Sequence, residues 1–186
     1  TVTADDQDKF YDGSVFSPFS VTYTGFVNGE GASVVGGTVT YTGDATTEID
    51  AGTYTITPDV TGLTATNYTF AAANGTLTIT KVALTVTAQD KSKAYDGSVY
   101  SPFTVAYTGF VNGETASVVS GEVTYEGSAA TAVNAGTYTI TPVVTGLTAT
   151  NYTFAATNGT LTITKVALTV TADDQDKFYD GSVFSP

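Results

Sequence analysis

Apolar residues alternate with threonine along most of this chain. The alternation is clearest at 19–23, 38–42, 53–57, 67–72, 76–80 and 84–88. A period of two residues is typical of a β-strand with one buried face and one face in water. Threonine suits the wet face because it is β-branched and polar. Helical periodicity is nearly absent, so the pattern predicts an all-β fold.

The whole pattern repeats after 84 residues, with eighteen differences between 1–84 and 85–168. Residues 169–186 then repeat 1–18 letter for letter. A period of this length favours an array of small domains, each with its own core. We therefore predict β repeat domains at 1–82 and 83–166. Residues 167–186 would form the opening strand and turn of a third repeat.

The differences between the two copies test the predicted strands. Positions 20 and 22 differ, whereas Phe19, Val21 and Tyr23 are kept in the second copy. Sequence variation at alternate residues is expected when one face of a strand is exposed to solvent and the other face packs against the core. The strand assignment therefore agrees with the variation.

The sequence Lys-x-Tyr-Asp-Gly-Ser occurs at 9–14, 93–98 and 177–182. Asp-Gly favours a tight turn, because the aspartate side chain can accept backbone N–H groups and glycine supplies a left-handed conformation. We interpret the motif as a structural joint that each copy needs. Tyr11 would anchor the turn against the domain.

Three further local predictions follow from turn chemistry. Asn-Gly within 73–76 favours a type I′ hairpin between the flanking strands. Pro58 would end the strand at 53–57, because proline has no N–H to donate. The segment 26–35 is the one place where a short helical turn is expected.

The junction between the copies, residues 76–88, contains no Pro or Ser and none of the glycine-rich sequence of a flexible linker. Leu77 and Ile79 face inward on odd numbers, whereas Val82, Leu84 and Val86 face inward on even numbers. The phase changes at Lys81, so one strand runs almost directly into the next. We predict a stiff, elongated array.

Composition excludes several classes of function. The chain has no Cys, Met, Trp or His, and 18 acidic residues against 6 basic ones give a net charge of −12. Such a surface repels nucleic acid and anionic membranes, so we expect neither as a partner. Disulfides, thiolate sites and histidine-based catalysis are excluded as well. No apolar run is long enough to span a membrane, and targeting signals would lie outside this segment.

Four ordered motifs carry a resemblance to a known family. The sequences LTVTADDQDKFYDGS, YTGFVNGE, AGTYTITP and NYTFAAANGTLTI resemble the YDG/MBG-type repeats of large bacterial adhesin-like surface proteins. The resemblance implies an extracellular, tandemly repeated β module at the bacterial cell surface. It implies small β-sandwich domains of immunoglobulin-like type in an elongated array, with β-grasp-like modules as the alternative, and no catalytic residues.

Candidate chemistry is sparse. Calcium at the acidic cluster Asp5, Asp6, Asp8 and Asp12 is one hypothesis, and a solvated acidic loop is the alternative. The second copy has Gln89, Asp90, Ser92 and Asp96 there.

Three other residue sets have side chains that could carry chemistry. Lys9 and Lys81 recur in the second copy and could in principle form isopeptide bonds with asparagine, although ordinary surface lysines explain them better. Asp44 and Glu48 form a carboxylate pair that the second copy lacks. Glu30 recurs as a glutamate in the same loop and is interpreted as a turn residue.

These observations predict a non-enzymatic stalk or adhesin module that acts as a stiff extracellular spacer, with no catalytic, cofactor-binding or metal site assigned. Its expected partners are the adjacent repeats of the same chain. A glycan- or protein-binding module that grips a host ligand remains an alternative. A further alternative is a fibre-forming subunit, in which the C-terminal partial repeat joins one chain to the next head to tail.

Overall fold

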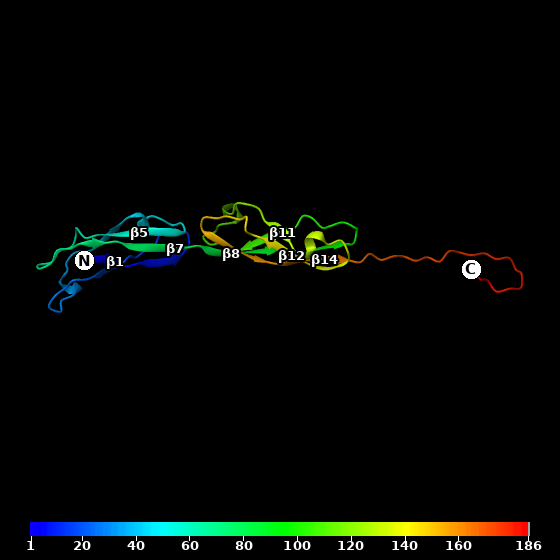
Figure 1. Ribbon diagram of the computed structural model, residues 1–186, viewed down its shortest axis with the longest axis horizontal. Coiled ribbons are helices and arrows are strands. Elements are labelled where there is room, and N and C mark those ends of the chain that lie inside the picture. Colours follow the sequence, from blue (N-terminus) through cyan, green and yellow to red (C-terminus); the bar gives the residue numbers. More distant parts are fainter. Residues whose placement is uncertain (186) are drawn as a thin grey trace.

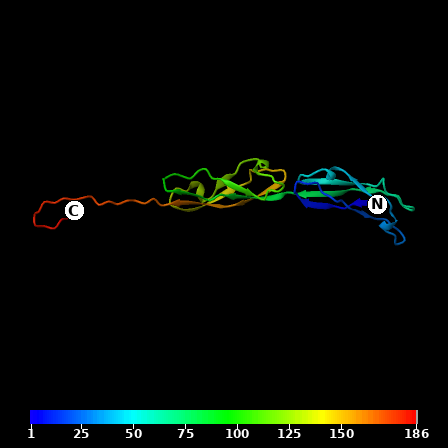
Figure 2. The ribbon, with the colours of Figure 1, turned by 180° about the vertical axis from the view of Figure 1, so that it is seen from behind.

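The computed structural model describes residues 1–185 and shows an elongated β protein (Figure 1). Two sandwich-like bodies lie end to end, and an extended C-terminal segment continues along the same axis. The view from behind shows the same arrangement (Figure 2). The predicted all-β fold in an elongated array is confirmed.

The first body, called unit 1, contains two sheets of mixed direction. Strand β1 pairs antiparallel with β3 and parallel with β6, while the second sheet has the order β4-β5-β7-β2. The chain changes sheets between β1 and β2, so the two opening strands lie in different layers. The strands are β1 (Val2–Ala4), β2 (Gln7–Phe10), β3 (Val21–Tyr23), β4 (Thr40–Thr42), β5 (Gly52–Asp59), β6 (Ala72–Ala73) and β7 (Gly75–Thr80).

The second body, unit 2, repeats this topology with sheets β10-β8-β13 and β11-β12-β14-β9. Its strands are β8 (Val82–Ala88), β9 (Lys91–Ala94), β10 (Val105–Thr108), β11 (Thr124–Glu126), β12 (Gly136–Val143), β13 (Tyr152–Thr157) and β14 (Gly159–Thr164). Within residues 1–185 the helical segments are short 3-10 turns: η1 (Ala32–Val34), η2 (Asp44–Thr46), η3 (Ala116–Val118) and η4 (Ser128–Thr131). Neither unit, within residues 1–185, has an α-helix packed on a sheet, which favours the sandwich over the β-grasp alternative.

The core follows the predicted alternation. Leu77 and Ile79 are buried in unit 1, and Leu84 and Val86 are buried in unit 2. Lys81 is the single residue between β7 and β8. The odd-to-even change of phase therefore occurs where the sequence predicted it, and the last strand of unit 1 leads directly into the first strand of unit 2.

The predicted hairpin at 73–76 is wrong. Strands β6 and β7 belong to different sheets, and neither Asn74 nor Gly75 has a positive φ. The glycine serves a close approach instead, because a Cβ at Gly75 would lie 2.4 Å from the carbonyl oxygen of Ala4. A crossing between two sheets and a hairpin use the same small residues, so the sequence signal was ambiguous.

Two other local predictions need correction. Strand β5 continues through Pro58 to Asp59, with Pro58 opposite Tyr41 of β4. The pairing of β5 with β7 stops at Ile56, so the missing N–H removes no bond on that side. The helical turn within 26–35 is present as η1, but it is accompanied by η2, which the sequence did not predict.

Residues 165–185 form no strand and extend away from unit 2 (Figure 1). Leu168 and Val170 are 91% and 94% exposed. The segment nevertheless keeps its turn, because Lys177 pairs with Asp180 at 2.8 Å. Neither Leu168 nor Val170 packs its side chain on unit 2. The described residues include no helix long and apolar enough to cross a membrane.

Candidate functional site: the joint between the units

The Lys-x-Tyr-Asp-Gly-Ser motif folds into the predicted turn. Asp12 Oδ1 accepts the backbone N–H of Ser14 at 2.9 Å and its hydroxyl at 2.7 Å, while Gly13 takes a φ of 76°. Lys9 pairs with the same carboxylate. These contacts hold the pKa of Asp12 at about 2, through the bonds from Lys9 and then from Ser14.

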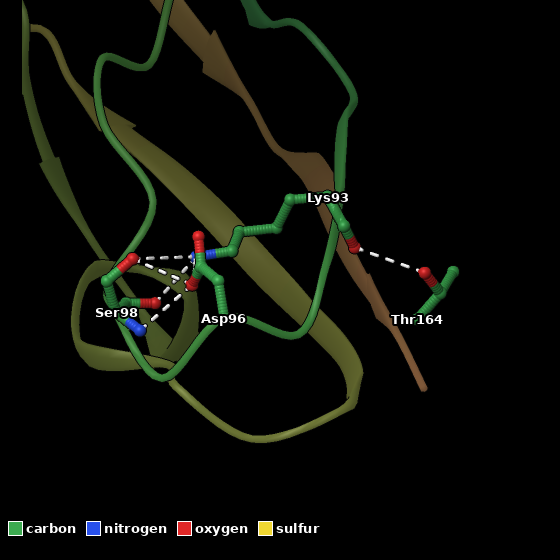
Figure 3. A network of polar contacts seen from close by, with 4 residues as sticks. All are labelled: Lys93, Asp96, Ser98 and Thr164. Atoms are coloured by element: carbon green, nitrogen blue, oxygen red, sulfur yellow. Dashed lines mark hydrogen bonds and ion pairs between the residues drawn. The ribbon is translucent and has the colours of Figure 1, made fainter. Parts of the chain in front are cut away.

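The second copy forms the same turn from Lys93, Asp96 and Ser98 (Figure 3). Thr164 at the end of β14 donates its hydroxyl to the carbonyl oxygen of Lys93 at 3.3 Å. The lysine, aspartate and serine bond one another, so these three motif residues are explained by the turn itself. The tyrosine of the motif has a different role.

Tyr11 connects unit 1 to unit 2. Its ring is 3% exposed and packs edge-on against Tyr152, with ring centroids 5.8 Å apart at 80°. Its hydroxyl donates to Glu114 Oε1 at 2.6 Å. The prediction placed Tyr11 against its own domain, and the structure extends this role to the following unit. Apolar contacts consequently run from the core of unit 1 through Tyr11 to Leu84 and Tyr152.

Asn151 makes the second set of contacts across the junction. Its Oδ1 accepts the N–H of Ala51 at 2.8 Å, and its Nδ2 donates to Asp50 Oδ1 at 2.9 Å. Lys81 Nζ donates to the carbonyl oxygen of Ala149 at 2.9 Å. Three separate segments of unit 1 therefore contact unit 2. We call this set of contacts the joint; its residues are Tyr11, Asp50, Ala51, Lys81, Glu114, Ala149, Asn151 and Tyr152.

The close fit at the joint also explains the glycine of the motif. A Cβ at Gly13 would lie 2.2 Å from Nδ2 of Asn112, which belongs to a loop of unit 2. Gly13 therefore serves both its own left-handed turn and the approach of the next unit. Asn112 itself has a φ of 54°, which asparagine tolerates better than most residues.

The electrostatics of the joint keep its tyrosines protonated. The hydrogen bond to Glu114, followed by burial, raises the pKa of Tyr11 to about 12. Burial and the same carboxylate raise the pKa of Tyr152 as well. Both hydroxyls donate to Glu114, so one carboxylate bonds two neutral donors from different units.

The acidic cluster considered for calcium is dispersed by the fold. Asp5 accepts the hydroxyls of Ser20 and Thr22, and Asp6 accepts the N–H of Thr76. Asp12 is engaged in the turn described above. Within residues 1–185 no group of three or more acidic side chains is arranged to hold a metal ion.

The other candidate residues have structural partners. Asp44 Oδ1 accepts the N–H of Thr55 at 2.6 Å, and in the second copy Ser128 Oγ accepts the N–H of Thr139 in the same way. This explains why the carboxylate can be exchanged for serine. Lys9 and Lys81 bond Asp12, Ser14 and a backbone carbonyl rather than an asparagine side chain.

Sequence reasoning missed the joint residues Glu114 and Asn151. Glu114 was interpreted as a turn residue without a partner, and Asn151 was not singled out for this role. The available signal was that both residues, together with Tyr152, are identical in the first copy as Glu30, Asn67 and Tyr68. The interpretation failed because their partners, Tyr11 and Asp50, lie 103 and 101 residues away in the sequence.

Comparison with known proteins shows the family to which the two repeats of this chain belong. No curated protein matches the sequence. One solved structure, a cell surface adhesin from Lactobacillus reuteri, is similar with 20% identity and a TM-score of 0.28, over 46% of this chain and 99% of that one. The family model for the MBG domain of YGX type matches residues 1–78 and 84–162, one match for each unit. The predicted family is thus confirmed: the chain belongs to the MBG domains of YGX type, of which it contains two copies in tandem.

Proposed function

We propose that this chain is a stiff, non-catalytic spacer in a bacterial cell-surface protein of adhesin-like type. Membership in the MBG family supports a repeated surface module. The spacer role itself rests on one observation, which is the joint. Three segments of unit 1 contact unit 2 through hydrogen bonds and an aromatic pair, with Lys81 as the only residue between the connecting strands.

A joint of this kind restricts both bending and rotation. A hinge at Lys81 alone would leave two rotatable backbone angles, and a flexible linker would add glycine or serine. Here Tyr11 and Asn151 hold the units at two further positions away from the strand connection. Bending about the connection therefore requires that the partly buried hydrogen bonds to Glu114 or Asp50 are broken.

The distribution of aromatic side chains favours a spacer over a glycan-binding module. Within residues 1–164, Phe10 and Tyr95 are the most exposed aromatic residues, at 70% and 45%. Phe10 corresponds to Ala94 in the second copy. Stacking on sugar rings needs an exposed aromatic face, and the two units share none in equivalent positions.

Small-angle X-ray scattering tests the spacer role. The wild-type chain is expected to scatter as one rod-like body. A Gly-Ser-Gly-Ser insertion after Lys81 should separate the units and increase the flexibility seen in the scattering curve. The same insertion after Lys165 leaves the joint intact and serves as the matched control. If the wild-type chain were as flexible as the chain with the insertion after Lys81, the spacer proposal would be wrong.

A further inference from the structure

The chain enters and leaves unit 2 at opposite ends of the unit. Strand β8 begins beside the junction, and β14 ends at the far end (Figure 1). The first segment of the unit, β8 followed by β9, runs parallel to the last segment, β13 followed by β14, and pairs with it. A tensile force on the chain therefore pulls two paired segments lengthwise past each other.

The paired segments keep one register through both sheets. In one sheet residues 82–87 lie opposite 152–157, and in the other sheet residues 91–94 lie opposite 161–164. Unit 1 has parallel pairs of the same kind, β1 with β6 and β2 with β7. We call the four paired strands of unit 2, which are β8, β9, β13 and β14, the clamp.

The two halves of the clamp are joined where both segments cross from one sheet to the other. Neither ladder of strand pairs covers this crossing. Asp90 Oδ1 accepts the N–H of Thr160 at 2.7 Å, and the two residues are 70 positions apart, as are the strand pairs on either side. A Cβ at Gly159 would lie 2.4 Å from the carbonyl oxygen of Ala88, so the segments cross in close contact. In unit 1, Asp6 makes the same bond.

The first and the last strand of the clamp are also held from their other sides. Strand β8 lies between β10 and β13, and β14 lies between β12 and β9. The bonds of a parallel ladder are evenly spaced along both strands. A lengthwise pull therefore loads all of them together, whereas a pull at one end of the ladder breaks them one after another.

We propose that each unit bears tensile force along the chain and that the clamp is the element that carries this force. Asp90 is a positioning residue in this function, because it joins the two ladders of the clamp across the sheet crossing. The role explains why the aspartate is present in both copies, whereas the preceding residue changes from Asp5 to Gln89. The inference uses only pairings within one unit. It is therefore independent of the spacer role, which concerns bending at the joint.

Pulling the full chain in optical tweezers tests the clamp, because the direction of the force can be chosen. The chain has no cysteine, so two introduced cysteines define where the DNA handles attach. Ala83→Cys with Lys165→Cys places the handles at opposite ends of the clamp and loads it lengthwise. Ala94→Cys with Lys165→Cys places both handles at one end, because Ala94 lies opposite Thr164, and peels the strands apart. All three substituted side chains are exposed.

The unfolding force of unit 2 should be more than about twofold higher in the lengthwise pull than in the peeling pull at the same loading rate, because the bonds share the load only in the lengthwise pull. Forced unfolding reports the rate of unfolding along the direction of the pull. Thermal midpoints of the two variants should agree, which shows that the difference comes from direction and not from stability. Equal forces in the two directions would overturn the proposal.

Substitution of Asp90 tests its positioning role. Asp90→Ala should lower the lengthwise unfolding force by about a third or more, because the two ladders of the clamp then fail one after the other. The peeling force should stay unchanged, since peeling starts at the end of the clamp beyond the crossing. Asp90→Asn keeps an acceptor oxygen and should retain most of the lengthwise force.

Gln89→Ala is the matched control for Asp90→Ala. Gln89 is the adjacent exposed residue, and its side chain accepts the hydroxyl of Thr104 outside the clamp. This control should leave both forces unchanged. If Asp90→Ala lowered the two forces alike, or if Gln89→Ala lowered the lengthwise force as much, the role assigned to Asp90 would be wrong.

Discussion

Replacing Tyr11 by phenylalanine tests whether the joint stabilises the chain. The substitution removes only the hydroxyl, and with it the 2.6 Å hydrogen bond to Glu114. The ring remains in place against Tyr152. Tyr95→Phe is the matched control, because Tyr95 occupies the same position of the motif in the second copy and is 45% exposed.

The expected magnitude follows from the charge of the acceptor. Hydrogen bonds to charged groups contribute about 1.5–3 kcal/mol. Glu114 is partly exposed and keeps its second donor, Tyr152, so the lower end of this range applies. Tyr11→Phe should therefore lower the free energy of unfolding by about 1.5 kcal/mol. Tyr95→Phe should change it by less than about 0.5 kcal/mol, as is usual for surface substitutions.

Urea unfolding followed by far-ultraviolet circular dichroism measures the difference. The pH dependence adds a second readout, because Tyr11 has a pKa of about 12 in the folded chain and about 10 when unfolded. A raised pKa contributes stability that is complete below pH 10 and is lost as the pH rises through 12. The gap between the wild type and Tyr11→Phe should close over that interval. Equal losses for the two substitutions at neutral pH would refute the role assigned to the joint.

Three further substitutions test the local structure. Asp44→Ala should lower the thermal midpoint through a loss of about 1 kcal/mol, because it removes a solvent-exposed hydrogen bond to a backbone N–H of strand β5, whereas Glu48→Ala should be near neutral. Gly75→Ala should cost about 3 kcal/mol in urea unfolding, because the new methyl group meets a carbonyl oxygen of strand β1 at 2.4 Å. Lys9→Met should raise the pKa of Asp12 from about 2 toward 3.8 in an NMR titration. The stabilising contribution of that lowered pKa is present above pH 4 and is lost as the pH falls through 2; an unchanged pKa would show that the ion pair is absent in solution.

The fold was predictable from local pattern, because alternation reports directly on which face of a strand is buried. The odd-numbered Leu77 and Ile79 and the even-numbered Leu84 and Val86 were assigned to the core from sequence alone. The turn at Asp12 was predicted for the same reason, since its bonds join residues within five positions of one another. Local chemistry decides these features, so a single sequence contains the evidence for them.

The joint and the sheet crossing were not predictable in the same way. Asn74 and Gly75 carry the signal of a tight turn, and only the position of β1 in the other layer shows that the chain crosses between sheets. Likewise Glu114 has no local partner and acquires its function from Tyr11, which is 103 positions earlier. Alternation specifies which residues face inward, but it does not specify which sheet or which unit they meet.

The contact residues that the two copies share explain why an array can be built from one repeated sequence. Each unit carries a tyrosine and a lysine at one end and a glutamate, an asparagine and a tyrosine at the other, and all of these are identical in the two copies. The residue at Asp50 differs, but its counterpart Asn134 keeps a side-chain oxygen that can accept the same bond. Elsewhere, the residues that differ between the two copies lie mainly on strand faces that are exposed to solvent. A head-to-tail contact requires that both halves persist in every unit, since each unit is donor to one neighbour and acceptor to the other. Loss of either set of contact residues in one copy would remove the joint at that unit alone. A change on a solvent-exposed strand face would leave all the joints intact.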